Sequence, residues 1–263
     1  MRREMSYEEK YKMMIETPVN KLIPRLAVPT IISMLITSIY NMADTFFVSQ
    51  LSTAASGAVG VNFSLMAMIQ AIGFTLGMGS GNYMSRMLGE KKQEKAQRAC
   101  STAVYTAFVC GLLLAVFGIW NMDSLVRLLG ATETIAPYAK DYGKYILIAA
   151  PYMTVSFVFN NHLRAQGNAA LSMFGITTGG VLNVILDPVL IFHFEMGISG
   201  AAVATIFSQF ISFLILLFLV IRSGNVLKPC PRFFTMKGWV YKEILSAGMP
   251  TLGRQGLASV ASV

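Results

Sequence analysis

Six long apolar runs restrict the folds open to this chain more than any other feature. They lie at about 23–48, 59–84, 99–120, 138–160, 171–193 and 198–221. Each run is near or above the roughly 20 residues that an α-helix needs to cross a bilayer. A seventh run begins near Ile244 and is still apolar at Val263, with Arg254 in its middle. The pattern predicts an all-α integral membrane protein with six transmembrane helices and the start of a seventh.

The composition excludes an ordinary soluble domain. Hydrophobic residues make up 54% of the chain and charged residues only 13%, whereas a soluble domain has about 25% charged residues. Mean hydropathy is +0.57, so the lipid bilayer is the expected surroundings. The net charge of +8 comes from short basic tracts between apolar runs, which indicates membrane topology and argues against a nucleic-acid partner.

The positions of the basic residues predict the orientation. Lysines and arginines precede the first run, separate the second from the third, and follow the fourth and sixth, whereas the opposite loops have balanced charge. The positive-inside rule therefore places the amino terminus in the cytoplasm. The predicted divisions are a cytoplasmic segment 1–22, a six-helix lobe 23–222, a cytoplasmic linker 223–243 and the start of a second lobe at 244–263.

Two acids inside the runs suggest an ion-coupling site. Asn183 and Asp187 lie in the run 171–193 and share one helix face, because they are four residues apart. Asp44 lies in the first run. A carboxylate at bilayer depth costs roughly 2.5–3.5 kcal/mol on the insertion scale, so it is expected to face a protein interior or a wet cavity. Two such acids without a basic residue at like depth suit a pair that shares protons or sodium.

Each of these assignments has a simpler structural alternative. Asp44 could cap the outer end of its helix. Pro29 lies inside the first run, where a proline can act as the bending point of a gate or can produce only a static kink. Thr205 belongs to a polar stripe of the sixth run that could complete the oxygen shell of a cation, or could bond to its own helix. We expect His162, at the cytoplasmic end of the fourth run, to be an interfacial polar residue.

A short internal sequence similarity suggests a duplicated unit. Leu26-Ala27-Val28-Pro29-Thr30 resembles Ala247-Gly248-Met249-Pro250-Thr251, and both segments open an apolar run after a basic approach. Such a similarity is expected when a six-helix unit is repeated, with the second copy beginning near residue 242.

Four motifs together resemble the multidrug and toxic compound extrusion (MATE) family of cation-coupled efflux transporters. They are NMADTFFVSQL ending the first run, LRAQGNA after the fourth, GGVLNVILDPVLIF in the fifth and GISGAAVATIFSQ opening the sixth. The resemblance covers nearly the whole chain. It implies that this chain is the amino-terminal half of a twelve-helix fold made of two six-helix lobes.

The resemblance also implies the function and its residues. It implies alternating access, with a drug or toxic organic cation leaving as protons or sodium enter across a bacterial inner (plasma) membrane. The family's cation site falls on Asp44, Asn183, Asp187 and Thr205, and its bending proline falls on Pro29. No other metal, cofactor or enzymatic activity is implied. The partner missing from this chain is the carboxyl-terminal lobe.

Three other readings remain open from the sequence. The first is a lipid-linked precursor flippase of the same superfamily, which would need an arginine-rich cavity that the six runs do not offer. The second is an inactive truncated membrane fragment. The third is an integral membrane enzyme, for which no pair of residues has catalytic spacing at one membrane face.

Overall fold

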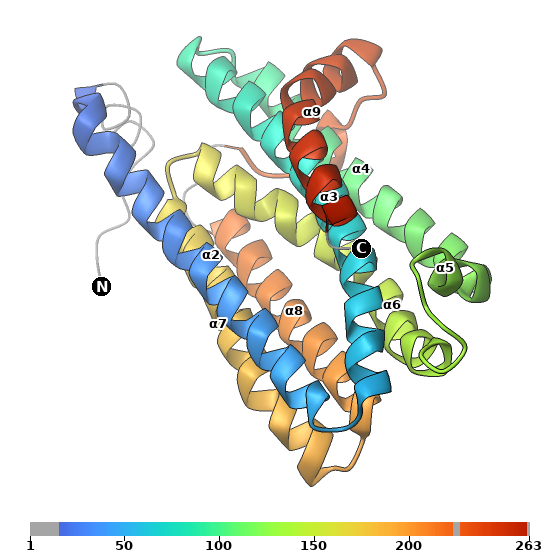
Figure 1. Cartoon of the computed structure of the whole chain (residues 1–263). Helices are drawn as coiled ribbons and strands as arrows, with labels where there is room; N and C mark the ends of the chain where they lie inside the picture. Colours follow the sequence, from blue (N-terminus) through green and yellow to red (C-terminus); the bar gives the residue numbers. More distant parts are fainter. Residues whose placement is uncertain (1–15, 223–226, 262–263) are drawn as a thin grey trace.

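The computed structural model describes residues 16–222 and 227–261, and the described residues form helices and no strand. The long helices are α2 (Val19–Ser49), α3 (Thr53–Gly89), α4 (Gln93–Trp120), α6 (Ala136–Ala165), α7 (Ala169–Pro188), α8 (Gly197–Arg222) and α9 (Gly238–Ala261). The short elements are α5 (Met122–Leu128), the π-helical turn η1 (Val189–His193) and the 3-10 turn η2 (Pro231–Phe233). Figure 1 shows the long helices side by side in one bundle, with α5 at its edge.

The predicted runs correspond to these helices, but the helix formed by the fourth run is less apolar than the others. Five helices are long and apolar enough to cross a membrane, namely α2, α3, α4, α7 with η1, and α8. The run 138–160 forms α6, which is 30 residues long but is not among these five. Its buried residues include Asn160 and His162, and it packs against α3, α4, α7 and α8. We infer that α6 is less apolar because its polar side chains face protein.

Three parts of the predicted divisions lie outside the described residues: residues 1–15 of the amino-terminal segment, residues 223–226 of the linker and residues 262–263. The helix predicted to begin near Ile244 begins earlier, at Gly238.

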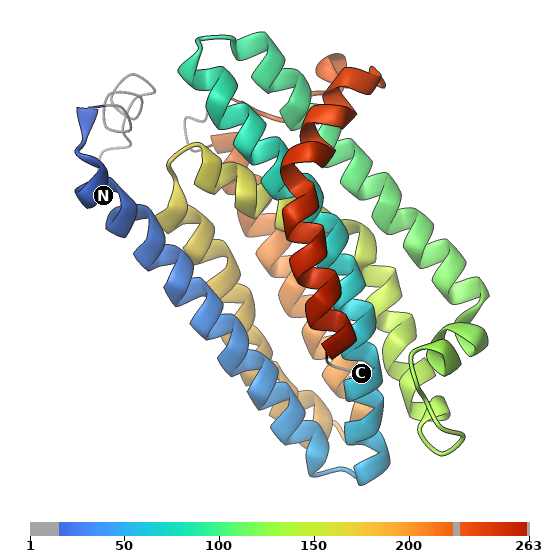
Figure 2. The same cartoon turned by 45° about the horizontal axis from the view of Figure 1, so that its top comes forward.

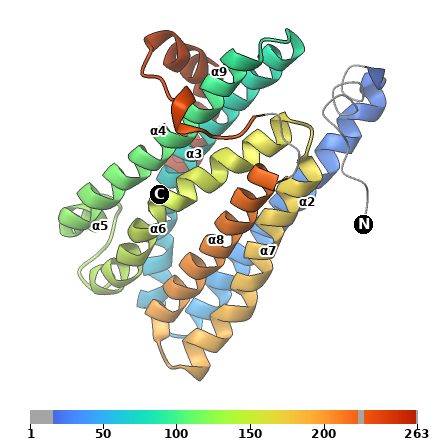
Figure 3. The same cartoon turned by 180° about the vertical axis from the view of Figure 1, so that it is seen from behind.

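The order of packing places α6 at the centre of the bundle, in contact with α3, α4, α7 and α8. α3 packs against α4, α6 and α9, and α2 packs mainly against α7. Seen from behind, α8 lies between α6 and α7, with α2 beyond α7 (Figure 3). The helices α2, α6, α7 and α8, which carry the predicted polar residues, are therefore neighbours.

Glycine contacts hold α9 against α3, and Figure 2 shows the two helices running alongside each other. A Cβ atom at Gly79 would collide with the carbonyl oxygen of Ile244, and one at Gly248 would collide with the carbonyl oxygen of Thr75. The small residues at these positions therefore permit close contact between the two helices.

The segment before α9 is fixed to α4 by hydrogen bonds between backbone and side chains. The backbone N–H of Cys230 donates to the hydroxyl of Ser101 over 3.1 Å, and that of Thr235 donates to Thr102 over 3.3 Å. The described part of the predicted linker is therefore packed on the bundle.

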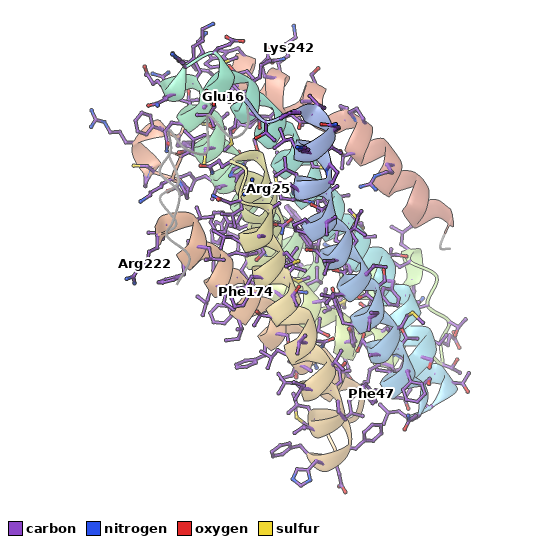
Figure 4. All side chains as sticks on the ribbon, turned by 90° about the vertical axis from the view of Figure 1, so that its left-hand side faces the viewer. Glu16, Arg25, Phe47, Phe174, Arg222 and Lys242 are labelled. Atoms are coloured by element: carbon purple, nitrogen blue, oxygen red, sulfur yellow. The ribbon has the colours of Figure 1, made fainter. Side chains whose placement is uncertain are left out.

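The two ends of the bundle differ in charge. Figure 4 shows Arg25, Arg222 and Lys242 towards one end of the molecule and Phe47 towards the other. The end that gathers these basic residues is the one that the sequence predicts to be cytoplasmic.

The contact between α3 and α9 generates the first prediction. Gly79→Ala should lower the free energy of unfolding by about 1–3 kcal/mol, because the added methyl group forces two packed backbones apart. Gly60→Ala in the same helix is the control, since a Cβ atom there meets nothing within 4 Å. Thermal unfolding of the detergent-purified chain measures both variants. Equal melting temperatures for Gly79→Ala and Gly60→Ala would contradict the packing described.

Candidate cation site between α2, α6, α7 and α8

Asp44 lies on the one buried stripe of a mostly exposed helix. The buried residues of α2 are Ser33, Tyr40, Asp44 and Val48, and the last three follow each other at four-residue intervals, so they share a face. Only 5% of Asp44 is exposed, so the carboxylate points into the bundle rather than towards lipid. α2 continues to Ser49 and its C-cap is Gln50, so the alternative that Asp44 caps the outer end of its helix is wrong.

Glycines on α7 let this helix approach both of its neighbours. A Cβ atom at Gly179 would come within 2.8 Å of Ser212 on α8, and one at Gly180 within 3.1 Å of Tyr40 on α2. The apolar run GGVLNVILDPVLIF thus brings its polar residues between α2 and α8, since the two glycines precede Asn183 by one turn.

Asn183 connects the fifth predicted run to the sixth. Its side-chain Nδ2 donates to Oδ1 of Asp187 over 3.1 Å and to Oγ1 of Thr205 on α8 over 3.3 Å. Asp187 is 0% exposed, Asn183 2% and Thr205 3%. The structure therefore brings three of the four predicted cation ligands into one hydrogen-bonded group.

A tyrosine that the sequence analysis did not select joins the group to Asp44. Tyr142 of α6 is completely buried, and its hydroxyl donates to Oδ2 of Asp44 over 3.4 Å. It also interacts with the side chain of Thr205, and its environment includes the charges of both Asp44 and Asp187. The two carboxylates interact electrostatically with each other as well. Asp44 and Thr205 thus both contact one buried tyrosine, and Asn183 links Thr205 to Asp187.

The group presents oxygen atoms that have no hydrogen-bond partner. Oδ1 of Asp44, Oδ1 of Asn183 and Oδ2 of Asp187 are buried and unpaired, and so is Oγ of Ser208 on the same face of α8 as Thr205. Within the described ranges, no ion pair involves either carboxylate. Buried polar atoms without partners are rare in folded proteins. An all-oxygen donor set of this kind fits a proton or a hard cation such as sodium.

The described residues contain no cluster of three or more histidine, cysteine or acidic residues, so this part of the chain offers no group of the kind that binds transition metals.

Pro29 does not belong to this group. It lies inside α2, 15 residues before Asp44, which corresponds to roughly 22 Å along a helix. The helix runs from Val19 to Ser49 without a break, and the hydroxyl of Ser33 donates to the carbonyl oxygen of Pro29 over 2.9 Å.

His162 is not interfacial, as the sequence analysis expected, but completely buried. It shares a 2.7 Å hydrogen bond with Ser80, and its other ring nitrogen lies 3.6 Å from the sulfur of Cys100. This contact joins α3, α4 and α6 away from the acidic group.

A helical membrane bundle that buries two unpaired acids is of the type found in ion-coupled transport proteins. Comparison with known proteins identifies the family: the MatE family model matches residues 29–189. The chain therefore belongs to the MatE family, and it corresponds to the amino-terminal lobe of these efflux transporters.

The relatives extend well beyond this chain. The multidrug export protein MepA of Staphylococcus aureus (strain MRSA252) is 27% identical over 236 residues, which are 89% of this chain and 52% of MepA. An outward-facing multidrug resistance MATE transporter has a TM-score of 0.88 at 28% identity, and the match covers 96% of this chain and 56% of that one.

A transporter of the MOP superfamily from Pyrococcus furiosus Vc1 has a TM-score of 0.87 at 28% identity, with the same coverage of 96% and 56%. The chain thus spans about half the length of the relatives it matches.

The central position of Asn183 generates the second prediction. Asn183→Ala should cost about 1–3 kcal/mol of unfolding free energy, because Asp187 and Thr205 would both lose their buried donor. Asn121→Ala serves as the control, since Asn121 is exposed and its side chain bonds only to the carbonyl oxygen of Phe117 in the same helix region. Thermal unfolding in detergent measures the difference. A destabilisation of Asn183→Ala no larger than that of Asn121→Ala would show that the group does not hold the helices together.

Proposed function

We propose that this chain is the amino-terminal lobe of a cation-coupled multidrug efflux antiporter that works by alternating access. The observation that supports the proposal most strongly is the pair of buried acids, Asp44 and Asp187, whose free oxygens have no partner. A buried carboxylate is costly as a bare anion, so it binds a proton or a cation. Asp44, Asn183, Asp187 and Thr205 are the proposed ligands of that proton or sodium ion, with Tyr142 as an added contact of Asp44.

The proposed mechanism couples the charge of this site to the shape of α2. The buried stripe of α2 is narrow, and Asp44 is its charged member. When a proton or sodium ion neutralises the acids, the cost of packing α2 against α7 falls and the helix can change shape. Pro29 is the proposed bending point, since a proline leaves the carbonyl four residues earlier without its helix donor.

The remaining assignments follow from topology. With the amino terminus in the cytoplasm of a bacterial plasma membrane, the six-helix lobe spans 23–222, the linker runs from residue 223 to the start of α9 at Gly238, and α9 begins the second lobe. The proposed substrates are small molecules, and the role is that of a transporter rather than an enzyme. MepA is a multidrug export protein, which supports drugs as one substrate class.

A lipid-linked precursor flippase remains the second candidate, and one observation favours it. The sequence analysis found no arginine-rich cavity in the six predicted runs, but Arg164 lies within α6 and lines a cavity that Arg254 also lines. An inactive truncated fragment is the third candidate. The Pyrococcus furiosus transporter is described as having a binding pocket of reversed polarity, so pocket charge differs among proteins of this fold.

Sodium binding generates the third prediction. Sodium should stabilise the purified chain against thermal unfolding by about 1.4 kcal/mol at a concentration roughly ten times its dissociation constant. Asp187→Asn should abolish this stabilisation, because the amide has no charge for the cation. Asp123→Asn on α5 should retain it, since Asp123 is exposed and pairs with Lys140. Melting curves in sodium chloride and in N-methylglucamine chloride at equal ionic strength provide the measurement.

Two outcomes separate the candidates. If sodium has no effect, the same curves measured across pH test a proton at the same acids, again lost in Asp187→Asn. Dye efflux from vesicles under a sodium or a pH gradient then tests transport. Binding without efflux would identify the chain as a lobe that needs its second half. Undiminished gradient-driven efflux by Asp187→Asn would refute the coupling mechanism.

A further inference from the structure

The end of the bundle that gathers the basic residues has a hollow of about 320 Å³ between the start of α4 and the segment before α9. It is separate from the acidic group and from the cavity of about 600 Å³ whose walls come from six helices and include Arg164 and Arg254. Figure 3 shows the segment before α9, which contains η2, against α4. The described residues that line the hollow are Glu94, Arg98, Arg232, Phe233, Phe234 and Thr235. The proposed mechanism uses none of them.

The charge of the hollow is positive and only partly neutralised. Arg98 pairs with Glu94, one turn earlier on α4, with 2.7 Å between Nη2 and Oε1. Arg232 of η2 forms no ion pair with a carboxylate in the described part of the chain. Two guanidinium groups and one carboxylate thus line the hollow, and Arg232 keeps its N–H donors for an anion. Guanidinium groups bind phosphates through paired donors of this kind.

The two walls of the hollow are bonded to each other. The backbone N–H of Thr235 donates to the hydroxyl of Thr102 on α4 over 3.3 Å, and this hydroxyl donates in turn to the carbonyl oxygen of Thr235 over 3.4 Å. The ring of Phe234 stands edge-on to that of Tyr105, with 5.8 Å between the ring centroids. A site between walls held in this way loses little conformational freedom when a ligand binds.

These contacts fix the depth of the hollow in the membrane. Arg98 directly precedes the predicted apolar run 99–120, and Tyr105, the ring partner of Phe234, lies two turns further along α4. The hollow therefore spans the level at which the polar head groups of a bilayer meet its hydrocarbon core. Aromatic side chains are enriched at this level, and Phe234 is 40% exposed.

An apolar stripe leads from the hollow along α4 into the bilayer. Val109, Leu112 and Val116 follow Tyr105 at intervals of three or four residues, so they share one face of the helix with it. Their exposed fractions are 50%, 44% and 52%, so this face is open to lipid. The distance from Arg98 to Leu112 along the helix is roughly 21 Å, whereas half of a hydrocarbon core measures roughly 15 Å. The stripe is long enough for the acyl chain of a lipid in one leaflet.

We propose that this hollow binds the head group of an anionic phospholipid, with the phosphate between Arg98 and Arg232 and an acyl chain along the stripe of α4. Basic pockets at the cytoplasmic surface of membrane proteins bind such head groups. A soluble phosphate would contact the arginines but would gain nothing from the stripe. The bound lipid would join η2 to α4 and hold the segment before α9 on the bundle. None of the four proposed cation ligands lines the hollow, so the binding does not rest on the proposed transport function.

Fluorescence quenching by brominated phospholipids tests the proposal. Trp120→Phe and Trp239→Phe remove the two tryptophans of the chain, and Phe234→Trp then places a single reporter in the wall of the hollow. The full chain is reconstituted in phosphatidylcholine, and increasing fractions of brominated phosphatidylglycerol or brominated phosphatidylcholine are added. Phosphatidylglycerol should bind beside the reporter at least fivefold more tightly than phosphatidylcholine. Equal quenching by the two lipids would overturn the proposal.

Arg232→Gln in the reporter chain should lower the preference for phosphatidylglycerol about fivefold, which is what one basic residue near an anionic surface contributes. Arg222→Gln is the matched control, since Arg222 is also exposed but stacks on Phe218 and does not line the hollow. It should keep the full preference. An equal loss in both variants would show a diffuse attraction of lipids to the basic end and would refute a site in the hollow.

Competition distinguishes a lipid from a soluble anion. Inorganic phosphate, added at constant ionic strength, should leave the quenching by phosphatidylglycerol unchanged. Displacement of the lipid by inorganic phosphate would assign the hollow to a soluble anion and overturn the lipid proposal.

Native mass spectrometry of the chain with its own tryptophans tests the same site if the reporter chain does not fold. The wild-type chain and Arg222→Gln should retain at least one more phosphatidylglycerol than Arg232→Gln at the same collision energy. Equal retention by all three would contradict the proposal. The sodium response of the acidic group is measured on different residues, so a failure of either proposal leaves the other standing.

Discussion

Two carboxylates held in a membrane bundle without a basic partner are the constraint on which the rest of this structure depends. Asp44 and Asp187 are both buried, and each keeps an oxygen without a partner. Burial of an unpaired charge costs several kcal/mol, so the bundle is stable only if protons, cations or hydrogen bonds offset that cost. Asn183 and Tyr142 supply the hydrogen bonds. The glycines of α7 are needed because only small side chains allow three helices to meet around these groups.

The helices of the bundle are not packed equally closely. The loosely packed helix α2 is the one that changes shape in the proposed mechanism. α3 packs on three helices, and α9 is fixed to it by contacts between backbones at Gly79 and Gly248. α2 instead buries a stripe one residue wide and exposes most of its apolar side chains. A helix with few buried contacts opens at a lower free-energy cost than the core. Asp44 therefore lies on α2, the helix that can change shape at a low free-energy cost when the charge of Asp44 is neutralised.

The fold and most of the site could be predicted from the sequence because the signals are local. Run length predicts the helices, and the spacing of Asn183 and Asp187 predicts their shared face. Tyr142 could not be selected, since a tyrosine in an apolar run is ordinary and only its contacts with Asp44 of α2 and Thr205 of α8 give it a role. His162 was assigned to an interface, and Arg164 to the loop after the fourth run, because that run was predicted to end near residue 160, whereas α6 continues to Ala165. The cavity needs six helices to be placed, which no single run indicates.

The distance between the acidic group and the arginine end of the cavity constrains how substrate and cation could be coupled in the proposed mechanism. Arg164 lies 22 residues along α6 from Tyr142, roughly 33 Å along the helix axis. At that separation two unit charges interact by about 0.5 kcal/mol for an effective dielectric constant of 20. Allosteric coupling of substrates usually amounts to about 1–3 kcal/mol, so direct interaction between a charge at Arg164 and a cation bound at the acidic group is too weak. In the proposed mechanism, coupling therefore passes through a helix that contacts both the acidic group and the cavity. α2 is such a helix, because Tyr40 lines the cavity and Asp44, one turn further on, belongs to the acidic group. Cation binding would then change the cavity by moving its wall rather than by competing for the same charge.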